Sequence, residues 1–129
     1  NIELVKKMPA VYGAPFREPQ NPGATCFQVF VGPNTIFQNG AARSIQQIED
    51  GTSNTFLIVD AGTPIPWTKP ADLEYDPEKP LPKLGAIMPN GFFAATADGS
   101  TQVIQSENGQ LPEAKIRAMI TAANRDFAP

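Results

Sequence analysis

The sequence contains no histidine and only one cysteine among its 129 residues. Without histidine, the chain cannot carry a Ser-His-Asp or Cys-His catalytic site, a histidine metal ligand or the usual side-chain switch near neutral pH. The single cysteine, Cys26, excludes an internal disulfide and a cysteine-rich zinc site. Because Cys26 lies within the apolar run of residues 25–31, it is expected to be a small buried side chain.

Charged residues are also few, at 18% of the chain, and the formal net charge is −3. No basic patch is available to neutralise phosphates, and aromatic residues do not alternate with Lys or Arg, so nucleic acid is not an expected partner. No apolar run approaches the ~20 residues of a membrane span, and no signal peptide is recognisable. The chain starts at Asn1 rather than Met, which suggests a processed or truncated form from which an anchor has been removed.

Apolar residues and proline are plentiful. Hydrophobic residues make up 41% of the chain, enough for a real core, and the 14 prolines and 10 glycines indicate a loop-rich globular protein. The length fits one domain over residues 1–129. Several strand-like runs precede one helical run, which predicts an α+β fold with a mainly antiparallel sheet, long proline-rich loops and a C-terminal helix.

Two runs of β-branched and aromatic side chains, residues 25–31 and 55–61, predict strands. The second run is almost continuously apolar, so it is expected to be a central strand buried on both faces. Residues 35–37 predict a further short strand.

Asp98 and Gly99 separate two more apolar runs, residues 92–97 and 100–104. An Asp-Gly pair in this position predicts a tight hairpin turn, because both residues tolerate the positive φ angles that such a turn requires. The carboxylate of Asp98 is the alternative candidate for a catalytic or metal-binding group, but the turn interpretation is the stronger one.

Helical patterns are confined to the ends and one internal segment. Residues 1–8 are expected to be either the end of a helix or an extended lead-in, and residues 44–51 are ambiguous, with one helical turn that Gly51 would end. Residues 111–124 predict a helix in which Pro112 occupies the first position. Its apolar stripe consists of Leu111, Ile116, Met119 and Ile120.

Two proline-rich segments are expected to be loops, at residues 9–23 and 62–85. The second is expected to pack across the sheet, held by Trp67 and Tyr75. Trp67 is either an exposed ligand platform or, more in keeping with an indole in a proline frame, a plug at the edge of the core whose N–H bonds to a backbone carbonyl.

An alternating acidic run follows Trp67. Calcium prefers several carboxylates on a flexible loop, but this run lacks the EF-hand pattern, and nearby lysines balance its charge. A solvated loop is therefore favoured over a calcium site. The run consists of Asp72, Glu74, Asp76 and Glu78.

Carboxylates are the remaining candidates for catalysis. Asp50, Asp60 and Asp98 lie beside predicted strands, and a glycosidase-like pair would require two of them to converge in a cleft. Ser53, in the hydroxyl-rich run of residues 50–55, has no histidine to activate it, so this run is interpreted as a capped turn.

Five stretches, in this order, resemble a large planctomycete family of exported proteins of unknown function. The Trp-Thr-Lys-Pro block at residues 67–70, with the proline-rich run behind it, is the specific part of the resemblance. Together the stretches cover most of the chain from about residue 25 onward. They are residues 31–37, 50–55, 66–73, 75–85 and 91–100.

The resemblance implies a fold and a location. Family members carry a prepilin-type N-terminal segment and are similar to type IV pilins and type II secretion pseudopilins, in which a hydrophobic helix precedes a globular sheet domain. The chain is then expected to be such a pilin-like globular part, in the cell envelope. The family often has a histidine ten residues before the Asp of its Asp-Gly pair, where this chain has Met88. No loop matches the calcium loop of major pseudopilins, so that ligand is not carried over.

The leading hypothesis is a non-enzymatic, envelope-associated structural or assembly domain, pilin- or pseudopilin-like, with no catalytic residue, metal site or cofactor. Its expected partners are copies of itself or envelope proteins, with membrane contact only through an N-terminal anchor. The alternative is a ligand-binding module that uses Trp67, Tyr75 and the acidic run to bind calcium, a glycan or a peptide. A carboxylate-only enzyme is the third hypothesis.

Overall fold

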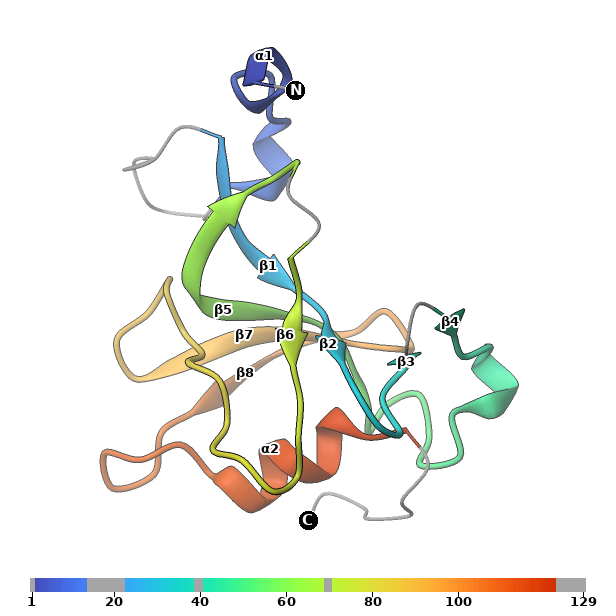
Figure 1. The fold of residues 1–129 in the computed structure, drawn as a ribbon. Helices are drawn as coiled ribbons and strands as arrows, with labels where there is room; N and C mark the ends of the chain where they lie inside the picture. Colours follow the sequence, from blue (N-terminus) through green and yellow to red (C-terminus); the bar gives the residue numbers. More distant parts are fainter. Residues whose placement is uncertain (1, 14–22, 39–40, 69–70, 123–129) are drawn as a thin grey trace.

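Two four-stranded sheets and a C-terminal helix form most of the computed structural model, which describes residues 2–13, 23–38, 41–68 and 71–122 (Figure 1). The predicted α+β fold with mainly antiparallel sheet content is confirmed. Sheet A has the order β1-β5-β7-β8, with every neighbouring pair antiparallel. Its strands are β1 (Ala24–Gln28), β5 (Phe56–Pro66), β7 (Gly91–Thr96) and β8 (Thr101–Gln105).

Sheet B is smaller and mixed, with the order β4-β3-β2-β6. Its central strand β2 pairs in parallel with both β3 and β6, whereas β3 and β4 are antiparallel. Each of its strands has two residues: β2 (Phe30–Val31), β3 (Phe37–Gln38), β4 (Ala41–Ala42) and β6 (Leu73–Glu74).

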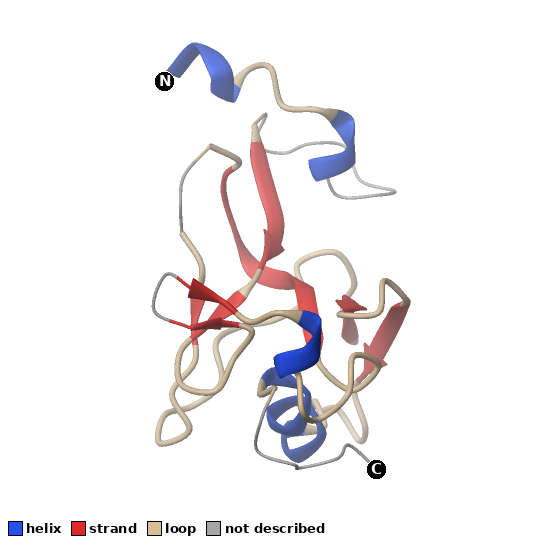
Figure 2. Ribbon diagram, turned by 90° about the vertical axis from the view of Figure 1, so that its right-hand side faces the viewer, coloured by secondary structure: helices blue, strands red, loops and turns tan. Residues whose placement is uncertain are grey.

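The helical segments are short. Figures 1 and 2 both place α2 at the opposite end of the molecule from α1. Within the described ranges, no helix has the length and apolar content required to cross a lipid bilayer. The helical segments are α1 (Ile2–Val5), η1 (Ala10–Tyr12), η2 (Ile45–Gln47) and α2 (Glu113–Ile120), of which η1 and η2 are 3₁₀ turns.

The hairpin predicted at Asp98 and Gly99 is confirmed. Strands β7 and β8 pair without a register shift from Gly91 and Gln105 to Ala95 and Thr101. Gly99 has a φ of 87°, a conformation that glycine adopts at little cost.

The predicted strand at residues 25–31 is present but divides between the two sheets. Strand β1 pairs with β5 in sheet A, and β2 begins two residues later in sheet B. The division occurs because the chain turns to a new partner: Val29 and Val31 accept backbone hydrogen bonds from Leu73 and Tyr75, at 2.9 and 2.8 Å. Cys26 is buried, as expected.

Strand β5 is central, as predicted for residues 55–61, but it is not buried on both faces. Phe56 and Val59 lie in the core, whereas the side chain of Ile58 is 39% exposed. The expectation was wrong on this point because helix α2 covers only one face of sheet A, and a continuous apolar run does not reveal how many faces are covered.

The main core lies between the inner face of sheet A and α2. Phe92, fully buried on β7, makes an edge contact with Phe56 at 5.9 Å between ring centroids. The apolar stripe predicted for the C-terminal helix is confirmed, with Leu111 partly buried beside it. The cluster consists of Phe30, Phe56, Val59, Tyr75, Phe92, Ala94, Ile104, Ile116, Met119 and Ile120.

Residues 62–85 contain more regular structure than the proline content suggested. Strand β5 continues to Pro66, and β6 lies in the middle of the segment. Tyr75 is buried in the core, so it does hold the segment against the rest of the fold. Trp67 is not part of this core.

Element boundaries differ from the predictions by a few residues. Residues 44–51 form a single 3₁₀ turn that ends before Gly51, and the short strand expected at residues 35–37 is β3, which begins at Phe37. Pro112 precedes α2 rather than occupying its first position, and residues 123–124 lie outside the described residues. At the N-terminus, α1 favours the helical alternative for residues 1–8.

The predicted loop at residues 9–23 is only partly described. Residues 9–13 contain the 3₁₀ turn η1, and residues 14–22 lie outside the described residues.

Candidate functional site

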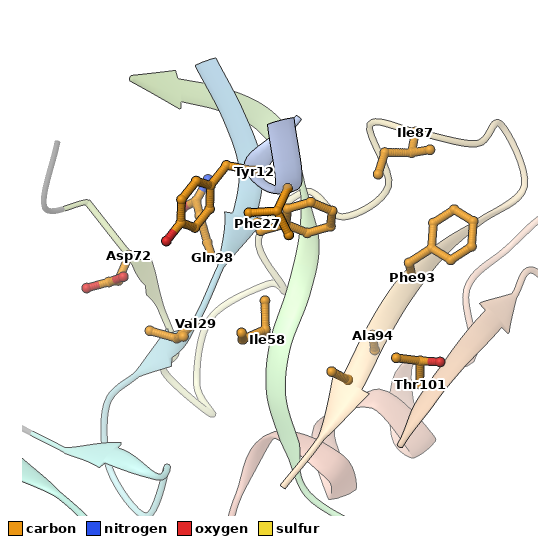
Figure 3. A pocket seen from close by; sticks show the side chains of 12 residues that line it. Tyr12, Phe27, Gln28, Val29, Ile58, Asp72, Ile87, Phe93, Ala94 and Thr101 are labelled. Atoms are coloured by element: carbon orange, nitrogen blue, oxygen red, sulfur yellow. The ribbon is translucent and has the colours of Figure 1, made fainter. Parts of the chain in front are cut away.

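An apolar groove crosses the outer face of sheet A, on the side away from α2. It has a volume of about 570 Å³, within the size range of ligand-binding clefts. Figure 3 shows its side chains coming from all four strands of the sheet and from the segments that border it. The lining residues are Val11, Tyr12, Phe27, Gln28, Val29, Ile58, Asp72, Ile87, Phe93, Ala94, Ala95 and Thr101.

The groove follows from the alternation of side chains along each strand. Phe92 and Phe93 are neighbours in β7, so their rings point to opposite faces of the sheet. Phe92 is fully buried in the core, and Phe93 lines the groove. Ile58 of β5 and Phe27 of β1 lie on the same outer face, which places aromatic and aliphatic groups across three neighbouring strands.

Polar groups are few and lie around the apolar floor. Gln28 uses its side-chain amide to donate to the carbonyl of Thr63, at 3.2 Å. Asp72, which is exposed, is the one charged side chain in the lining (Figure 3). This composition suits binding of an apolar body whose end carries a polar or positive group, because apolar burial supplies the affinity and a few polar contacts fix the orientation.

Asp60 supports one border of the groove. Its carboxylate is buried and accepts hydrogen bonds from the backbone amides of Ala86 and Ile87, at 3.2 and 3.3 Å. Burial raises the pKa of Asp60 above its ordinary value, although the amide hydrogen bonds oppose this effect. The result is a carboxyl group that holds Ile87 beside the groove but does not itself line it.

Asp98 is engaged within its own hairpin turn. One oxygen accepts from the Thr96 hydroxyl at 2.6 Å, and from the Ser100 hydroxyl and backbone amide at 2.7 and 3.0 Å. These hydrogen bonds lower the pKa of Asp98 to about 2, and the bond from Thr96 has the largest effect. The carboxylate therefore closes the turn, which agrees with the turn interpretation.

Asp98→Asn is expected to lower stability in a pH-dependent way. The folded-state pKa lies below the ordinary value of an aspartate, so the carboxylate contributes stability above pH 4 and loses this contribution as the pH falls toward 2. Urea unfolding from pH 7 to pH 2 should show a wild-type advantage that shrinks over that window. Ser100→Ala, which removes one hydroxyl donor to the carboxylate, should narrow the pH range over which the wild-type advantage shrinks. A difference in stability between the wild type and Asp98→Asn that does not change with pH would contradict this role for Asp98.

The acidic run does not gather into one cluster. The carboxylate of Asp76 accepts from the backbone amide of Glu78 at 2.9 Å and lies 3.9 Å from the ammonium of Lys79. Among the described residues, no group of three or more acidic, Cys or His side chains could hold a metal ion. These contacts are those of a solvated loop.

Trp67 and Tyr75 do not form one binding surface. Trp67 stacks on Tyr12 at 5.7 Å between ring centroids, and its indole N–H donates to the carbonyl of Leu4 at 3.0 Å. The predicted hydrogen bond to a backbone carbonyl is thus confirmed, but the ring packs on the N-terminal segment rather than on the core. Tyr75 is buried on the core side, where the Arg117 guanidinium lies 5.9 Å from its ring.

The turn predicted at residues 50–55 is present. Asn54 donates through its side-chain amide to the carbonyl of Asp50, and the hydroxyl of Thr55 donates to the carbonyl of Gly51, both at 3.0 Å. Asp50 is buried and, like Asp60 and Asp98, does not line the groove.

Apart from Asp72 of the acidic run, the sequence does not single out the residues that line the groove. The continuous apolar run of residues 55–61 predicts burial of Ile58, and the adjacent phenylalanines of β7 indicate only a strand. Strict alternation of faces in β7 was the available signal, because one of two consecutive phenylalanines must leave the core side. No family model, curated protein or solved structure matches the chain.

Proposed function

We propose that the chain is a non-enzymatic structural domain of an envelope-associated assembly, pilin- or pseudopilin-like, which binds the apolar face of an amphipathic protein helix in the groove on sheet A. The observation that carries the proposal is the uncovered apolar face formed by Phe27, Ile58 and Phe93. Monomeric proteins rarely leave a contiguous apolar surface of this kind without a binding role. The family resemblance supplies the envelope context.

The shape and composition of the groove support a helix as its occupant. An amphipathic helix binds by placing an apolar face in a hydrophobic groove, and the four strands of sheet A provide such a floor. Asp72 at one border favours a helix that carries a basic residue near that end.

A matched pair of isoleucine substitutions tests the groove. Ile58→Gln is expected to weaken binding of an amphipathic leucine-lysine peptide at least about tenfold, because it places an unpaired amide under the apolar face of the peptide. Ile45→Gln changes the same side chain at a site 69% exposed and outside the groove, and should leave binding unchanged. Fluorescence anisotropy of a labelled peptide measures both, and equal affinities for the two variants would count against the groove.

Sequencing the start of the gene tests the envelope part of the proposal separately. The gene is expected to encode a prepilin-type cleavage segment and a hydrophobic helix upstream of this chain. A start without such a helix would remove the pilin-like context while leaving the groove measurement valid.

The groove also favours a second candidate function, a binding module for a small apolar ligand or a peptide. Its volume of about 570 Å³ is sufficient for such a ligand. Binding of short apolar peptides regardless of their helical pattern would favour this candidate over the helix.

A further inference from the structure

Strand β8 is the last strand of sheet A and has one unpaired edge. The backbone amide of Thr96 donates to the carbonyl of Ser100 at 2.9 Å, and the backbone amide of Ser106 donates to the carbonyl of Asn90 at 2.8 Å. The register of β7 and β8 is unbroken between these two hydrogen-bonded pairs. In an antiparallel ladder, hydrogen-bonded pairs alternate with pairs whose backbone groups point outward. The amides and carbonyls of Thr101, Val103 and Gln105 therefore point away from β7.

Nothing in the described part of the chain bonds to these outward groups, and the side chains of all three residues are exposed. The strand also lacks the features by which proteins usually protect a sheet edge. It has no charged residue, no proline and no bulge, whereas the ladders on both sides of β5 contain register shifts. The outward amides and carbonyls along this edge are arranged to pair with another extended strand.

We propose that β8 pairs antiparallel with β8 of a second copy of this chain, with Val103 on the two-fold axis. The three outward residues are centred on Val103, so Thr101 of one copy lies opposite Gln105 of the other. Each outward amide then meets an outward carbonyl, which is the self-complementarity that a two-fold interface requires. The acidic residues nearest to β8 in the sequence, Asp98 and Glu107, lie outside the paired residues 101–105. Like charges therefore do not face one another within the ladder.

The side chains on the outer face favour the same partner. Val103 is 40% exposed and lies directly opposite Phe93, and Thr101 lies opposite Ala95. Pairing would bring the two copies of Val103 together, so the apolar strip from Phe93 would continue into the second sheet. Two grooves would then become one longer apolar surface. This inference concerns the sheet edge and does not depend on which occupant the groove takes.

Amide hydrogen exchange, followed by NMR over a range of protein concentrations, tests the pairing residue by residue. At a concentration where about nine-tenths of the chains are paired, exchange at Thr101, Val103 and Gln105 should slow about tenfold relative to dilute protein. Exchange at Gln102 and Ile104, which already bond to β7, should be slow at every concentration. Concentration-independent exchange at the three outward amides would overturn the proposal.

Substitutions at Val103 provide the second arm, read by sedimentation velocity. Val103→Pro removes an outward amide without removing a bond to β7, so it should abolish the dimer while the monomer stays folded. Val103→Lys places two like charges on the axis and should do the same if the proline variant misfolds. Val103→Thr, the matched control, keeps the branched shape and the amide and should dimerise like the wild type.

Two outcomes would overturn the proposal: wild-type protein that sediments as a monomer up to about 1 mM, or a dimer that survives both Val103→Pro and Val103→Lys. Ile58→Gln separates this test from that of the groove. It should leave the dimer intact even where it abolishes peptide binding, so failure of one proposal does not mimic failure of the other.

Discussion

Replacing Phe92 by alanine is expected to destabilise the protein by about 3–5 kcal/mol, the range observed for large aromatic side chains removed from a core. Phe92 is fully buried and contacts Phe56, and α2 packs over the cluster to which both belong. The cavity would therefore lie at the centre of the fold. Urea unfolding at neutral pH measures the effect directly.

Phe93→Ala is the matched control, one residue along the same strand. Because Phe93 lies on the outer face, its loss should cost about 1 kcal/mol or less in stability, but should weaken peptide binding at least about tenfold. Equal losses of stability at the two positions would contradict the assignment of one face to the core and the other to binding.

Gly85→Ala is expected to destabilise the protein by about 3 kcal/mol or more. Gly85 has a φ of 88°, and a Cβ at this position would collide with the carbonyl oxygen of Gly91. Since its amide also donates to the carbonyl of Asp60 at 2.9 Å, the backbone cannot move away without breaking that bond. The change should also displace Ile87 and so weaken peptide binding.

Gly99→Ala separates backbone strain from collision. Its φ of 87° is almost the same as that of Gly85, but nothing lies within 4 Å of the added Cβ. It should therefore cost about 1 kcal/mol, the penalty for a left-handed residue alone. Chemical unfolding of both variants under identical conditions measures the difference, and equal costs would show that the contact at Gly85 is relieved by movement.

Local signals in the sequence were sufficient for much of the fold. The Asp-Gly pair predicted the hairpin because its conformational demand is local, and the stripe that includes Ile116 and Met119 predicted the C-terminal helix. The α+β class followed from the order of these elements. Cys26 is buried as expected, because its apolar neighbours in the sequence indicate burial. Tyr75 is also buried, although Glu74 and Asp76 flank it in the sequence.

The rest depends on contacts between distant segments. Residues 25–31 have one composition throughout, and only the arrival of Leu73 and Tyr75 divides them between two sheets. The packing of Trp67 on Tyr12 likewise joins segments more than 50 residues apart. Side-chain propensity contains no information on such pairings.

The candidate site was missed for a related physical reason. An apolar residue in a strand is compatible with a covered face and with an open one, so Ile58 could not be assigned from composition. The distinction is made by α2, which packs against the inner face of sheet A and contributes no residue to the groove on the outer face.

The most direct measurement is NMR mapping of the amphipathic leucine-lysine peptide onto the labelled protein. Shift changes are expected at Phe27, Ile58 and Phe93, and a peptide with the same composition but scattered leucines should produce none. Shifts that instead cluster on α2, or identical maps for the two peptides, would contradict a helix-binding groove on sheet A.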